Sequence, residues 1–407
     1  MMLYRQMPSN GDRLSALGFG CMRLPTRGGR IDKAEAMKQI RYAIDNGVNY
    51  IDTAWPYHGG NSEKFLGEAL ADGYREKVKL ATKLPQFLCK SREDMYNFFD
   101  KQLGKLNVEV IDYYLIHMLN GVAWEQMKGL GIKEFMDDIR AKGQIRHIGF
   151  SFHGPKDDFP RIVDDYDWDF CQIQYNILDE NNQAGKSGLR YAASKGLGVI
   201  IMEPLLGGNL AGELPKQVKA HYDKADEKRS NVEWALKWVW NHPEVTVVLS
   251  GMNTMEQVSE NIRIASETPP DSLTEKEVGI LRKAADTYLS LRKIPCTGCR
   301  YCMPCPVGVD IPTAFELYNN RYLFNKRLTN RMLYLMRLGG IMAGEKPHLV
   351  SQCVSCGKCK QVCPQGINIP EELKKVQKEF EGPLGKVVMT LGRAYMNRGK
   401  KKRGHDA

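Results

Sequence analysis

Residues 48–63 read VNYIDTAWPYHGGNSE and combine a short apolar strand with an acid and a phenol just beyond it. The pattern predicts that the strand ends at Asp52 and that Tyr57 lies in the following turn. Two later apolar runs end in the same way, VKLATK at Lys83 and IDYYLIH at His117. Polar side chains at the ends of successive strands, with helical segments between them, predict a parallel β/α barrel with a site at its carboxyl face.

The alternation of strands and helices continues to about residue 267 and leaves room for eight strand–helix units. A short hairpin over residues 3–14 is expected to cap the closed end of the barrel. The last four strands are nearly continuous apolar runs, as expected for parallel strands that are covered on both faces. The predicted strands are 14–22, 49–54, 77–84, 110–117, 145–152, 169–176, 197–205 and 245–252.

Capping signals give the first helix boundaries. A helix is predicted over residues 32–46, and two others are expected to begin near Ser62 and at Ser91. The helix after Ser91 has acidic residues in its first turn, which the helix dipole favours. A further helix is predicted over residues 124–142, ending at Gly143.

The composition is that of an ordinary soluble globular protein, with 43% hydrophobic and 26% charged residues. The 407 residues exceed the ~250 that a single β/α barrel typically needs, so a second unit is expected. No run of ~18 apolar residues and no secretory signal is found, which predicts a cytoplasmic protein without a membrane span. Part of the net charge of +10 lies near the C-terminus in RGKKKRGHDA. We expect this tail to be a solvated end, with an acidic protein, anionic lipid or RNA as weaker options for a partner.

Eight cysteines form two closely spaced runs in the last third of the chain. The second run has the spacing C-x2-C-x2-C-x3-C-P of bacterial two-cluster ferredoxins, in which the fourth cysteine of each run binds the other cluster. The first run is one residue shorter, and both runs lead into a similar Ile-Pro exit. The two runs are Cys296, Cys299, Cys302 and Cys305, followed by Cys353, Cys356, Cys359 and Cys363.

This spacing predicts two [4Fe-4S] clusters with crossed ligands. One set is Cys296, Cys299, Cys302 and Cys363, and the other is Cys353, Cys356, Cys359 and Cys305. Zinc would be satisfied by two C-x2-C pairs and needs neither the third cysteine nor the Cys-Pro, and disulfides suit exported chains. The remaining cysteines, at positions 21, 89 and 171, are expected to be small hydrophobic residues of the barrel.

The segment SETPPDS at residues 266–272 interrupts the barrel pattern with paired prolines and marks a boundary. The predicted organisation is a barrel over residues 1–270, a connecting helix over 271–292, a mainly helical ferredoxin-type iron-sulfur domain over 293–380 and a basic tail over 381–407.

The strand-end residues resemble the catalytic set of the aldo-keto reductase family. Asp52 and Tyr57 in DTAWPY, Lys83 in ATK and His117 in LIH match that set, and the SE after the tyrosine loop matches as well. The resemblance implies an α/β fold with a parallel (β/α)8 TIM barrel. The whole chain resembles aldo-keto reductase-like oxidoreductases that carry a C-terminal ferredoxin domain.

The resemblance also implies a mechanism, the NAD(P)H-dependent reduction of an aldehyde or ketone. Tyr57 would give a proton to the developing alkoxide, and Lys83 would favour its phenolate, because a free phenol titrates near pH ~10. Asp52 would orient Lys83, and His117 would hydrogen-bond the carbonyl oxygen.

The later strand ends resemble the nicotinamide-nucleotide site of the same family. By this resemblance, Ser151 and Gln174 would hold the carboxamide, and Tyr175 would stack on the nicotinamide ring. A loop that crosses the pyrophosphate would include Leu205, Gly207 and Gly208. The adenosine end would lie near Gly251, Asn253, Thr254, Gln257 and Asn261. The last segment has no Lys or Arg to pair a 2′-phosphate, so the choice between NADP and NAD stays open.

A simple hydride transfer does not need iron-sulfur clusters, because a hydride carries two electrons and a cubane exchanges one. The clusters are therefore assigned either to electron exchange or to a structural role. The alternative function is an iron-sulfur electron-transfer protein, linked to a flavin or a ferredoxin, whose barrel is a docking scaffold. The expected partners are a small carbonyl substrate and ferredoxin or another redox protein. A flavin is not indicated by the sequence, and nucleic acid is not an expected partner.

Overall fold

The computed structural model describes residues 1–407 except 297, 299–301, 325–326, 340–346, 364 and 383–407. The chain divides into two compact units. The first comprises Met1–Gly212 and Ala225–Leu281, and the second comprises Glu213–Lys224 and Arg282–Ala407. In the described part of the chain, no helix is long and apolar enough to cross a membrane. The domain limits predicted at residues 270, 292 and 380 stay a prediction.

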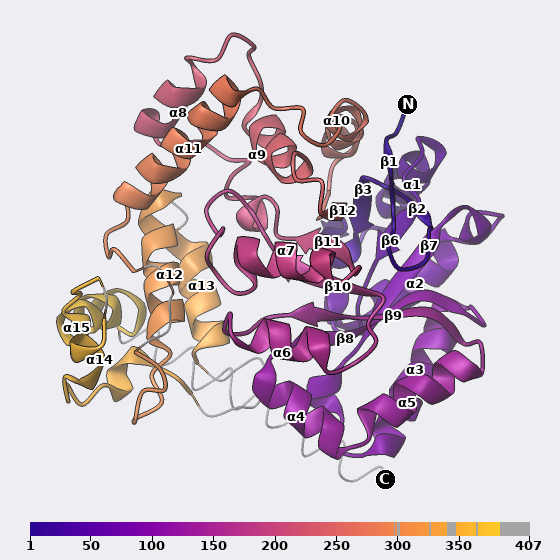
Figure 1. Cartoon of the computed structure of the whole chain (residues 1–407), viewed down its shortest axis with the longest axis horizontal. Coiled ribbons are helices and arrows are strands. Elements are labelled where there is room, and N and C mark those ends of the chain that lie inside the picture. Colours follow the sequence, from indigo (N-terminus) through magenta and orange to yellow (C-terminus); the bar gives the residue numbers. More distant parts are fainter. Residues whose placement is uncertain (297, 299–301, 325–326, 340–346, 364, 383–407) are drawn as a thin grey trace. The chain divides into compact units, whose positions relative to one another are not determined.

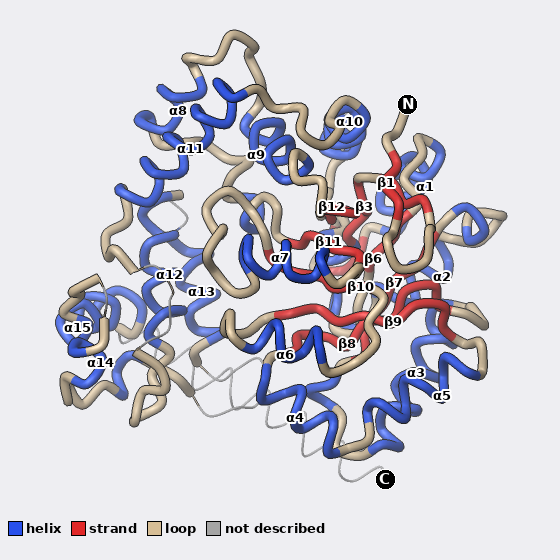
Figure 2. Tube along the Cα trace, viewed as in Figure 1, coloured by secondary structure: helices blue, strands red, loops and turns tan. Residues whose placement is uncertain are grey.

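The first unit is built on a closed barrel of eight parallel strands, which confirms the predicted fold class. Each strand pairs with the next one along the chain, and the last pairs with the first to close the ring. Figure 1 and Figure 2 show the strands enclosed by helices. The barrel strands are β3 (Leu17–Gly20), β6 (Tyr50–Asp52), β7 (Lys79–Leu84), β8 (Ile111–Leu119), β9 (Ile145–Phe152), β10 (Phe170–Gln174), β11 (Gly198–Met202) and β12 (Val245–Ser250).

The helices of this unit begin where the capping signals predicted. The Asp32 side chain caps the first one, and Ser91 and Asp94 form a reciprocal capping box on the third. A short antiparallel hairpin, β4 (Thr26–Arg27) with β5 (Arg30–Ile31), was not predicted. The helices are α1 (Lys33–Asp45), α2 (Ser62–Ala69), α3 (Arg92–Leu106), α4 (Gly121–Gly129), α5 (Ile132–Ala141), α6 (Asp158–Asp164), α7 (Gly185–Ser194), α9 (Asn231–Trp240) and α10 (Met255–Ser266).

The single helix predicted over residues 124–142 is wrong, because the chain forms α4 and α5 there instead. The two helices are separated at Gly131, whose φ of +82° lies in the left-handed region that glycine adopts without a steric penalty. The apolar periodicity continues through the break, which is why the sequence pattern alone does not reveal it.

Strand periodicity decides which side chains enter the barrel. Successive residues of a strand point to opposite faces, so every second side chain faces the lumen. The lumen core contains Tyr50, Ala81, Leu115, Phe170 and Ile200, one from each of five strands, and they are all buried. The side chain two positions further along each strand therefore faces the lumen as well, nearer to the carboxyl mouth.

The N-terminal hairpin closes the other end of the barrel, as predicted. Strands β1 (Tyr4–Gln6) and β2 (Arg13–Ser15) pair antiparallel, and Met7 and Leu14 of the hairpin join the lumen core. The hairpin turn thereby presents polar side chains to the amino ends of the barrel strands.

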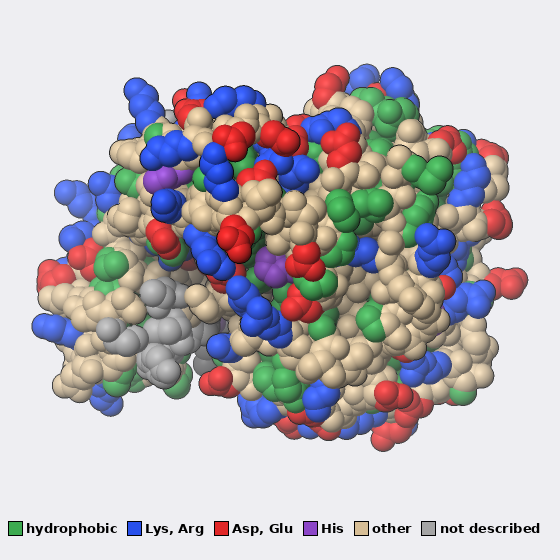
Figure 3. Space-filling model, turned by 45° about the horizontal axis from the view of Figure 1, so that its top comes forward, with side chains coloured by type: hydrophobic (Ala, Val, Ile, Leu, Met, Phe, Trp, Pro, Cys, Tyr) green, Lys and Arg blue, Asp and Glu red, His purple; other side chains and the backbone are tan. Residues whose placement is uncertain are grey.

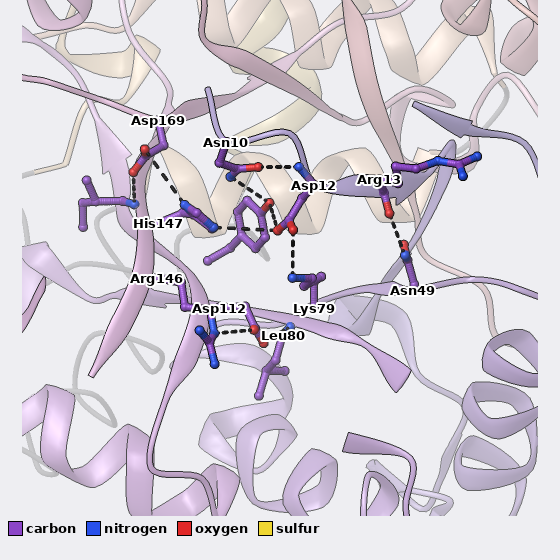
Figure 4. Close-up of polar contacts among 12 residues, drawn as sticks. Asn10, Asp12, Arg13, Asn49, Lys79, Leu80, Asp112, Arg146, His147 and Asp169 are labelled. Atoms are coloured by element: carbon purple, nitrogen blue, oxygen red, sulfur yellow. Dashed lines mark hydrogen bonds and ion pairs between the residues drawn. The ribbon is translucent and has the colours of Figure 1, made fainter. Parts of the chain in front are cut away.

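Asp12 anchors this hairpin, as Figure 4 shows. One carboxylate oxygen accepts a hydrogen bond from Lys79 at 2.9 Å, and the other accepts one from the Tyr113 hydroxyl at 2.9 Å. The His147 ring lies 3.7 Å from Asp12 and 4.0 Å from Asp169, which in turn accepts from a backbone N–H at 2.8 Å. The network ties the hairpin to β7, β8 and β9.

The second unit is mainly helical and has its own core. Tyr334 and Phe380 stack at its centre with ring centroids 4.7 Å apart. Helix α11 (Glu275–Ser290) runs from the first unit into the second. The other helices are α8 (Lys216–Tyr222), α12 (Ile311–Leu323), α13 (Arg327–Arg337), α14 (Lys358–Gln361) and α15 (Ile369–Phe380).

The two cysteine runs leave by the same local structure, which supports a duplicated motif. Gly308 N donates to Cys305 O at 2.9 Å, and Gly366 N donates to Cys363 O at 3.1 Å. Both glycines have positive φ, of +80° and +63°. Each turn leads into a helix with proline in its first turn, α12 or α15.

Charged side chains of both signs are interspersed over the face drawn in Figure 3. Residues 383–407 hold seven Lys or Arg and one Asp, so much of the net charge of +10 belongs to them. The predicted basic tail therefore lies mostly outside the described residues.

We expect Asp12→Asn to lower the free energy of unfolding by about 2 kcal/mol, because hydrogen bonds to charged groups contribute about 1.5–3 kcal/mol. Urea unfolding of the full chain at pH 7 measures it. Asp72→Asn is the control, since its ion pair with Arg41 is exposed. An equal loss in both variants would contradict the anchoring role.

The same network predicts a loss of stability in acid. The pKa of Asp12 is lowered, because the bonds from Lys79 and Tyr113 outweigh its burial, and burial lowers the pKa of His147. A depressed carboxyl pKa stabilises the fold above about pH 4 and loses this contribution as the pH falls through the folded pKa. A depressed histidine pKa makes the unfolded state bind more protons below about pH 6.5, so both groups weaken the fold in acid.

Candidate active site

A buried ammonium lies at the centre of the carboxyl mouth. Lys83 of β7 follows the lumen residue Ala81 by two positions, and its side chain is 1% exposed. Its Nζ donates to Asp52 Oδ1 at 2.6 Å and to the Thr53 carbonyl at 2.7 Å. Asp52, the last residue of β6, likewise follows the lumen residue Tyr50 by two positions. Two of the four predicted catalytic side chains thus form a buried ion pair.

The phenol of Tyr57 lies above this pair. Lys83 Nζ is 5.2 Å from the centroid of the Tyr57 ring. Tyr57 begins a short 3-10 turn in which His58 has φ +52° and Gly59 has φ +65°. The left-handed turn lets the chain reverse directly after the phenol and enter α2. A non-glycine residue in this conformation is strained, and such strain is typical of functional sites.

His117 completes the predicted set. It follows the lumen residue Leu115 in β8, and its ring centroid is 6.2 Å from that of Tyr57. Its Nδ1 is buried and has no hydrogen-bond partner in the described part of the chain. The structure therefore brings all four predicted catalytic residues together at the ends of three neighbouring strands.

Burial and charge decide the protonation states of these groups. Burial raises the pKa of Tyr57 above its usual value, although the Lys83 ammonium acts in the opposite direction. Burial, with a smaller contribution from Lys83, lowers the pKa of His117 well below its usual value. Burial alone would lower the pKa of Lys83, but Asp52 and Tyr57 raise it. The site therefore holds a neutral phenol, a neutral imidazole and an ammonium at neutral pH.

A second buried network fixes Lys83 from the helix side. Glu63 Oε1 accepts from Thr82 Oγ1 at 2.8 Å and from Gln102 Nε2 at 2.6 Å. The same Gln102 nitrogen donates to the Lys83 carbonyl at 3.0 Å. Ser62 accepts from Thr53 Oγ1 at 2.9 Å. The two residues of the SE motif thus hold the strands that carry the ion pair.

Residues 16–286 match the model of the aldo/keto reductase family. The chain belongs to the aldo/keto reductase family. Residues 295–367 match a 4Fe-4S dicluster domain, which indicates iron-sulfur clusters in this aldo/keto reductase. The predicted combination of the two is therefore confirmed.

Three relatives illustrate the similarity. L-galactose dehydrogenase of Arabidopsis thaliana is 28% identical over 293 residues, 65% of this chain and 88% of that protein. The NADH-specific methylglyoxal reductase of Escherichia coli is 25% identical over 324 residues, 67% of this chain and 95% of that protein. Among solved structures, aldo-keto reductase AKR11C1 from Bacillus halodurans in its holo form has a TM-score of 0.59 and 25% identity, and the match covers 70% of this chain and 96% of that one. This chain is accordingly an oxidoreductase of the aldo-keto reductase type.

A polar pair inside the reductase barrel fits the carboxamide of a nicotinamide. Ser151 Oγ accepts from Met118 N at 2.8 Å, which leaves its own proton free to donate. Gln172 of β10 lies opposite Ser151 in the strand register and follows the lumen residue Phe170. Its Oε1 is buried without a partner in the described chain. A hydroxyl donor beside an unpaired amide acceptor is what a carboxamide requires.

Two residues predicted to contact the nucleotide, Gln174 and Tyr175, point to other partners. The Gln174 amide is engaged elsewhere, donating to Asp179 at 2.8 Å and accepting from Gln183 at 2.9 Å. Tyr175 is fully buried, and its ring lies 5.0 Å from that of Trp238 in the helix layer. Strand alternation explains the position of Tyr175, which is an odd number of positions from the lumen residue Phe170, whereas Gln174 is occupied by its own hydrogen bonds.

Sequence reasoning missed Gln172, Met202 and Arg23. Gln172 lies in the same CQIQ run as Gln174, and counting two positions from a lumen residue would have selected it. Met202 ends β11 with its sulfur 3.7 Å from Gln172 Nε2. Arg23 has no motif. It is revealed by the glycines of two loops, since an added Cβ would lie 3.1 Å from its side-chain carbons at Gly251 and 3.3 Å from its Nη2 at Gly207.

The other predicted nucleotide residues lie in the loops after β11 and β12 and in α10. Gly207 and Gly208 have φ of +64° and +84° beside the half-buried Leu205. Thr254 caps α10 by accepting from Gln257 N at 3.3 Å, and the Gln257 side chain accepts from Asn253 N at 2.9 Å. Asn261 is buried and donates to Ser250 Oγ at 3.0 Å, so it holds α10 against β12. The exposed start of α10 leaves backbone N–H groups for an anion.

One of the two predicted cysteine sets surrounds a single cavity in the second unit. The cavity has a volume of about 140 Å³, and Cys302 also contributes to its wall. Cys305 lies in the wall of this cavity in spite of the shorter first run. The members of the set that line the cavity are Cys305, Cys353, Cys356 and Cys359.

The other set is described in part. Cys296, Cys302 and Cys363 pack against the core of the second unit, and Cys299 lies outside the described residues. Backbone N–H groups donate to the sulfurs of Cys296 and Cys353 at 3.4 Å each, and such bonds tune cluster potentials. Among described residues, no three His, Cys, Asp or Glu side chains converge on a position for one metal ion. Cysteines spread around a cavity wall fit a multi-iron cluster better than a single zinc ion.

We expect Cys305→Ala to reduce the iron content from about eight to about four atoms per chain, because it removes a ligand of one cubane. Iron and acid-labile sulfide are measured on anaerobically purified protein. Cys89→Ala is the matched control, since Cys89 lies in the barrel and bonds the Pro85 carbonyl. A full iron complement in Cys305→Ala would exclude it as a ligand.

Proposed function

We propose that this aldo/keto reductase reduces an aldehyde or ketone with NADH or NADPH, with Tyr57 as the proton donor. The observation that carries the proposal is the convergence of Tyr57, Lys83 and His117 at the carboxyl mouth. The nicotinamide would supply the hydride to the carbonyl carbon. The chain's own residues would hold the substrate oxygen and supply its proton.

Tyr57 is the acid of this scheme. Its raised pKa keeps the phenol protonated at neutral pH, so a proton is available for the alkoxide that develops during reduction. Lys83 stabilises the phenolate that remains after the transfer, and Asp52 keeps the ammonium in place. Burial raises the pKa of the resting phenol more than the ammonium lowers it. The ammonium therefore acts by stabilising the phenolate that the proton transfer leaves.

His117 directs the carbonyl. As a neutral imidazole it presents one N–H donor, and a neutral donor neither repels Lys83 nor competes with Tyr57 as an acid. Ser151 and Gln172 are assigned to the carboxamide, with Gln172 replacing the Gln174 of the sequence prediction. Arg23 is assigned to a phosphate of the nucleotide, because its guanidinium reaches the loop at Gly207.

We expect Tyr57→Phe to lower kcat for carbonyl reduction by at least about 100-fold with little change in nucleotide Kd. The phenyl ring keeps the packing and lacks only the hydroxyl group that donates the proton. Stopped-flow turnover and nucleotide binding by fluorescence are measured together, with the exposed Tyr42→Phe as control. Normal turnover in Tyr57→Phe would remove it from the mechanism.

We propose NADH as the preferred nucleotide. The turn at residues 251–257 has the sequence GMNTMEQ, with an acid and no Lys or Arg of its own to pair a 2′-phosphate, and the neighbouring Arg23 directs its guanidinium to the loop at Gly207. We expect Gln257→Arg to raise kcat/KM for NADPH about tenfold, since a charge-assisted bond is worth about 1.5–3 kcal/mol. Gln126→Arg, on the distant α4, is the control. A wild-type preference for NADPH would contradict the assignment.

The second candidate function is electron exchange through the clusters with a redox protein such as a ferredoxin. It is favoured by exposed groups next to the cysteine cavity, where Val354 is 65% and Val362 is 52% exposed beside the exposed Lys358. An apolar centre with basic neighbours suits an acidic carrier. The localisation in the cytoplasm stays a prediction.

An anaerobic nucleotide titration separates the two functions. The protein is loaded with iron and sulfide, flavin is quantified, and optical spectra are recorded as NADH is added. Tight binding without bleaching of the clusters supports a reductase whose clusters are structural or require a partner. Bleaching by NADH supports one redox path through both units. Absence of nucleotide binding would overturn the reductase proposal.

A further inference from the structure

The second unit presents an apolar stripe on the outer face of α13. The stripe consists of Leu328, Met332, Leu333 and Met336, which are 76%, 57%, 38% and 36% exposed. Residues four positions apart lie above one another on a helix, so Leu328, Met332 and Met336 form a continuous line along the axis. Scattered exposed apolar residues are normal on a protein surface, but a line of them on one helix face indicates a binding surface.

The opposite face of α13 is fixed in the core of the second unit. Asn330, Tyr334 and Leu335 are buried, and the Tyr334 ring stacks on Phe380 of α15. The Tyr334 hydroxyl also donates a hydrogen bond to the buried carboxylate of Glu381. Helix α13 packs against α12 as well, beside which it lies in Figure 1. A rotation that buried the stripe would expose these groups and break the bond to Glu381, so the stripe is held outward.

Arginine side chains border the stripe on both sides. Arg327 and Arg331 are four positions apart and each precedes a stripe residue, and Arg337 directly follows Met336. The helix contains no Asp or Glu. Arg337 lies 3.8 Å from Glu316 of α12, in a pair whose side chains are 45% and 40% exposed, and such a pair contributes little. The long apolar stem of arginine can lie along the stripe while its guanidinium binds a phosphate.

The chain that follows the second unit has the same sign of charge. Residues 383–407 lie outside the described structure, and they contain seven Lys or Arg and one Asp. The last described residue before them is Gly382, which directly follows the Glu381 that bonds Tyr334 of α13. The basic tail is therefore attached to the chain next to α13.

An apolar line with cations on both borders fits the surface of an anionic lipid bilayer. Leucine and methionine side chains can enter the boundary between headgroups and acyl chains, where the cations meet the phosphates. The core of a protein–protein interface is instead enriched in aromatic anchors and needs directional hydrogen bonds. The exposed face of α13 has leucine, methionine and one threonine, and no aromatic residue. Stable attachment to a membrane surface requires two signals, and the stripe and the basic tail supply one each.

We propose that α13 docks the second unit on the surface of an anionic lipid bilayer. The helix lies in the plane of the surface without crossing it, with Leu328, Met332 and Met336 in the interface and the arginines at the phosphates. The inference is independent of the proposed carbonyl reduction, because neither the residues around Lys83 nor the nucleotide takes part in it.

Co-sedimentation of the full-length, cluster-loaded protein with lipid vesicles tests the proposal. Vesicles of phosphatidylcholine alone are compared with vesicles that contain about one third phosphatidylserine. We expect at least about tenfold tighter binding to the anionic vesicles, and loss of most of this difference at about 0.5 M salt, because salt screens exposed charges. Absence of binding, or binding that does not depend on the anionic lipid, would overturn the proposal.

Variants of α13 separate the apolar and the basic contributions. Leu328→Ser and Met332→Ser should each weaken binding to the anionic vesicles about tenfold, since each removes an apolar side chain from the interface. Arg327→Gln should weaken it about fivefold and leaves the apolar stripe intact. Val122→Ser and Arg30→Gln are the matched controls, because both residues are exposed in the first unit, and they should bind as the wild type does. The iron content shows whether each variant keeps its fold.

Other occupants of the stripe would give different results. A second copy of the chain would form a dimer in sedimentation velocity without lipid, and dissociation of that dimer by Leu328→Ser would overturn the proposal. Replacing Lys400, Lys401 and Lys402 of the tail by Gln in the full chain should weaken vesicle binding and keep its dependence on Leu328. Vesicle binding that is lost with these lysines but unchanged in Leu328→Ser would assign the lipid contact to the tail and overturn the role of α13.

Discussion

The buried ion pair between Lys83 and Asp52 is the constraint on which the site depends. Taking both charges out of water is costly, and their attraction repays that cost only with good geometry and further hydrogen bonds. Here the ammonium has Asp52 at 2.6 Å and the Thr53 carbonyl at 2.7 Å. The same ammonium faces Tyr57 and His117. In the proposed mechanism this one buried charge would stabilise the phenolate left by proton transfer, and it also helps to keep the imidazole neutral.

The barrel supplies the geometry that this pair requires. Hydrogen-bonded parallel strands fix the spacing between β6, β7 and β8, and a packed lumen core lies directly beneath the site. Gly18 illustrates how tight this lumen is, because an added Cβ would lie 2.7 Å from the Leu249 side chain. Glu63 and Gln102 hold β7 from outside the barrel. The hairpin at the closed end, tied by Asp12, keeps the opposite ends of the same strands together.

The activities proposed for the two units transfer different numbers of electrons. A hydride carries two electrons to the substrate, whereas each cubane exchanges one. Carbonyl reduction by the barrel is chemically complete without the clusters. The cysteine cavity and its exposed neighbours nevertheless have features of a docking surface, an apolar centre beside lysine. A reductase unit and an electron-exchange unit in one chain are compatible with both candidate functions, and the response of the clusters to nucleotide distinguishes them.

The sequence by itself determined the features that depend on local pattern. Alternating apolar strands and capped helices predicted the barrel. Polar residues at and just beyond the strand ends predicted Lys83 and the three residues around it, and cysteine spacing predicted the iron-sulfur domain. Tertiary structure decided what depends on side-chain direction and loop approach. It favours Gln172 over Gln174 for the proposed carboxamide contact, because the Gln172 Oε1 has no partner among the described residues whereas both amide atoms of Gln174 are engaged, and it turned Tyr175 into the helix layer. It also brought Arg23 to Gly207, because residues far apart in the chain meet only when the strands close into a ring.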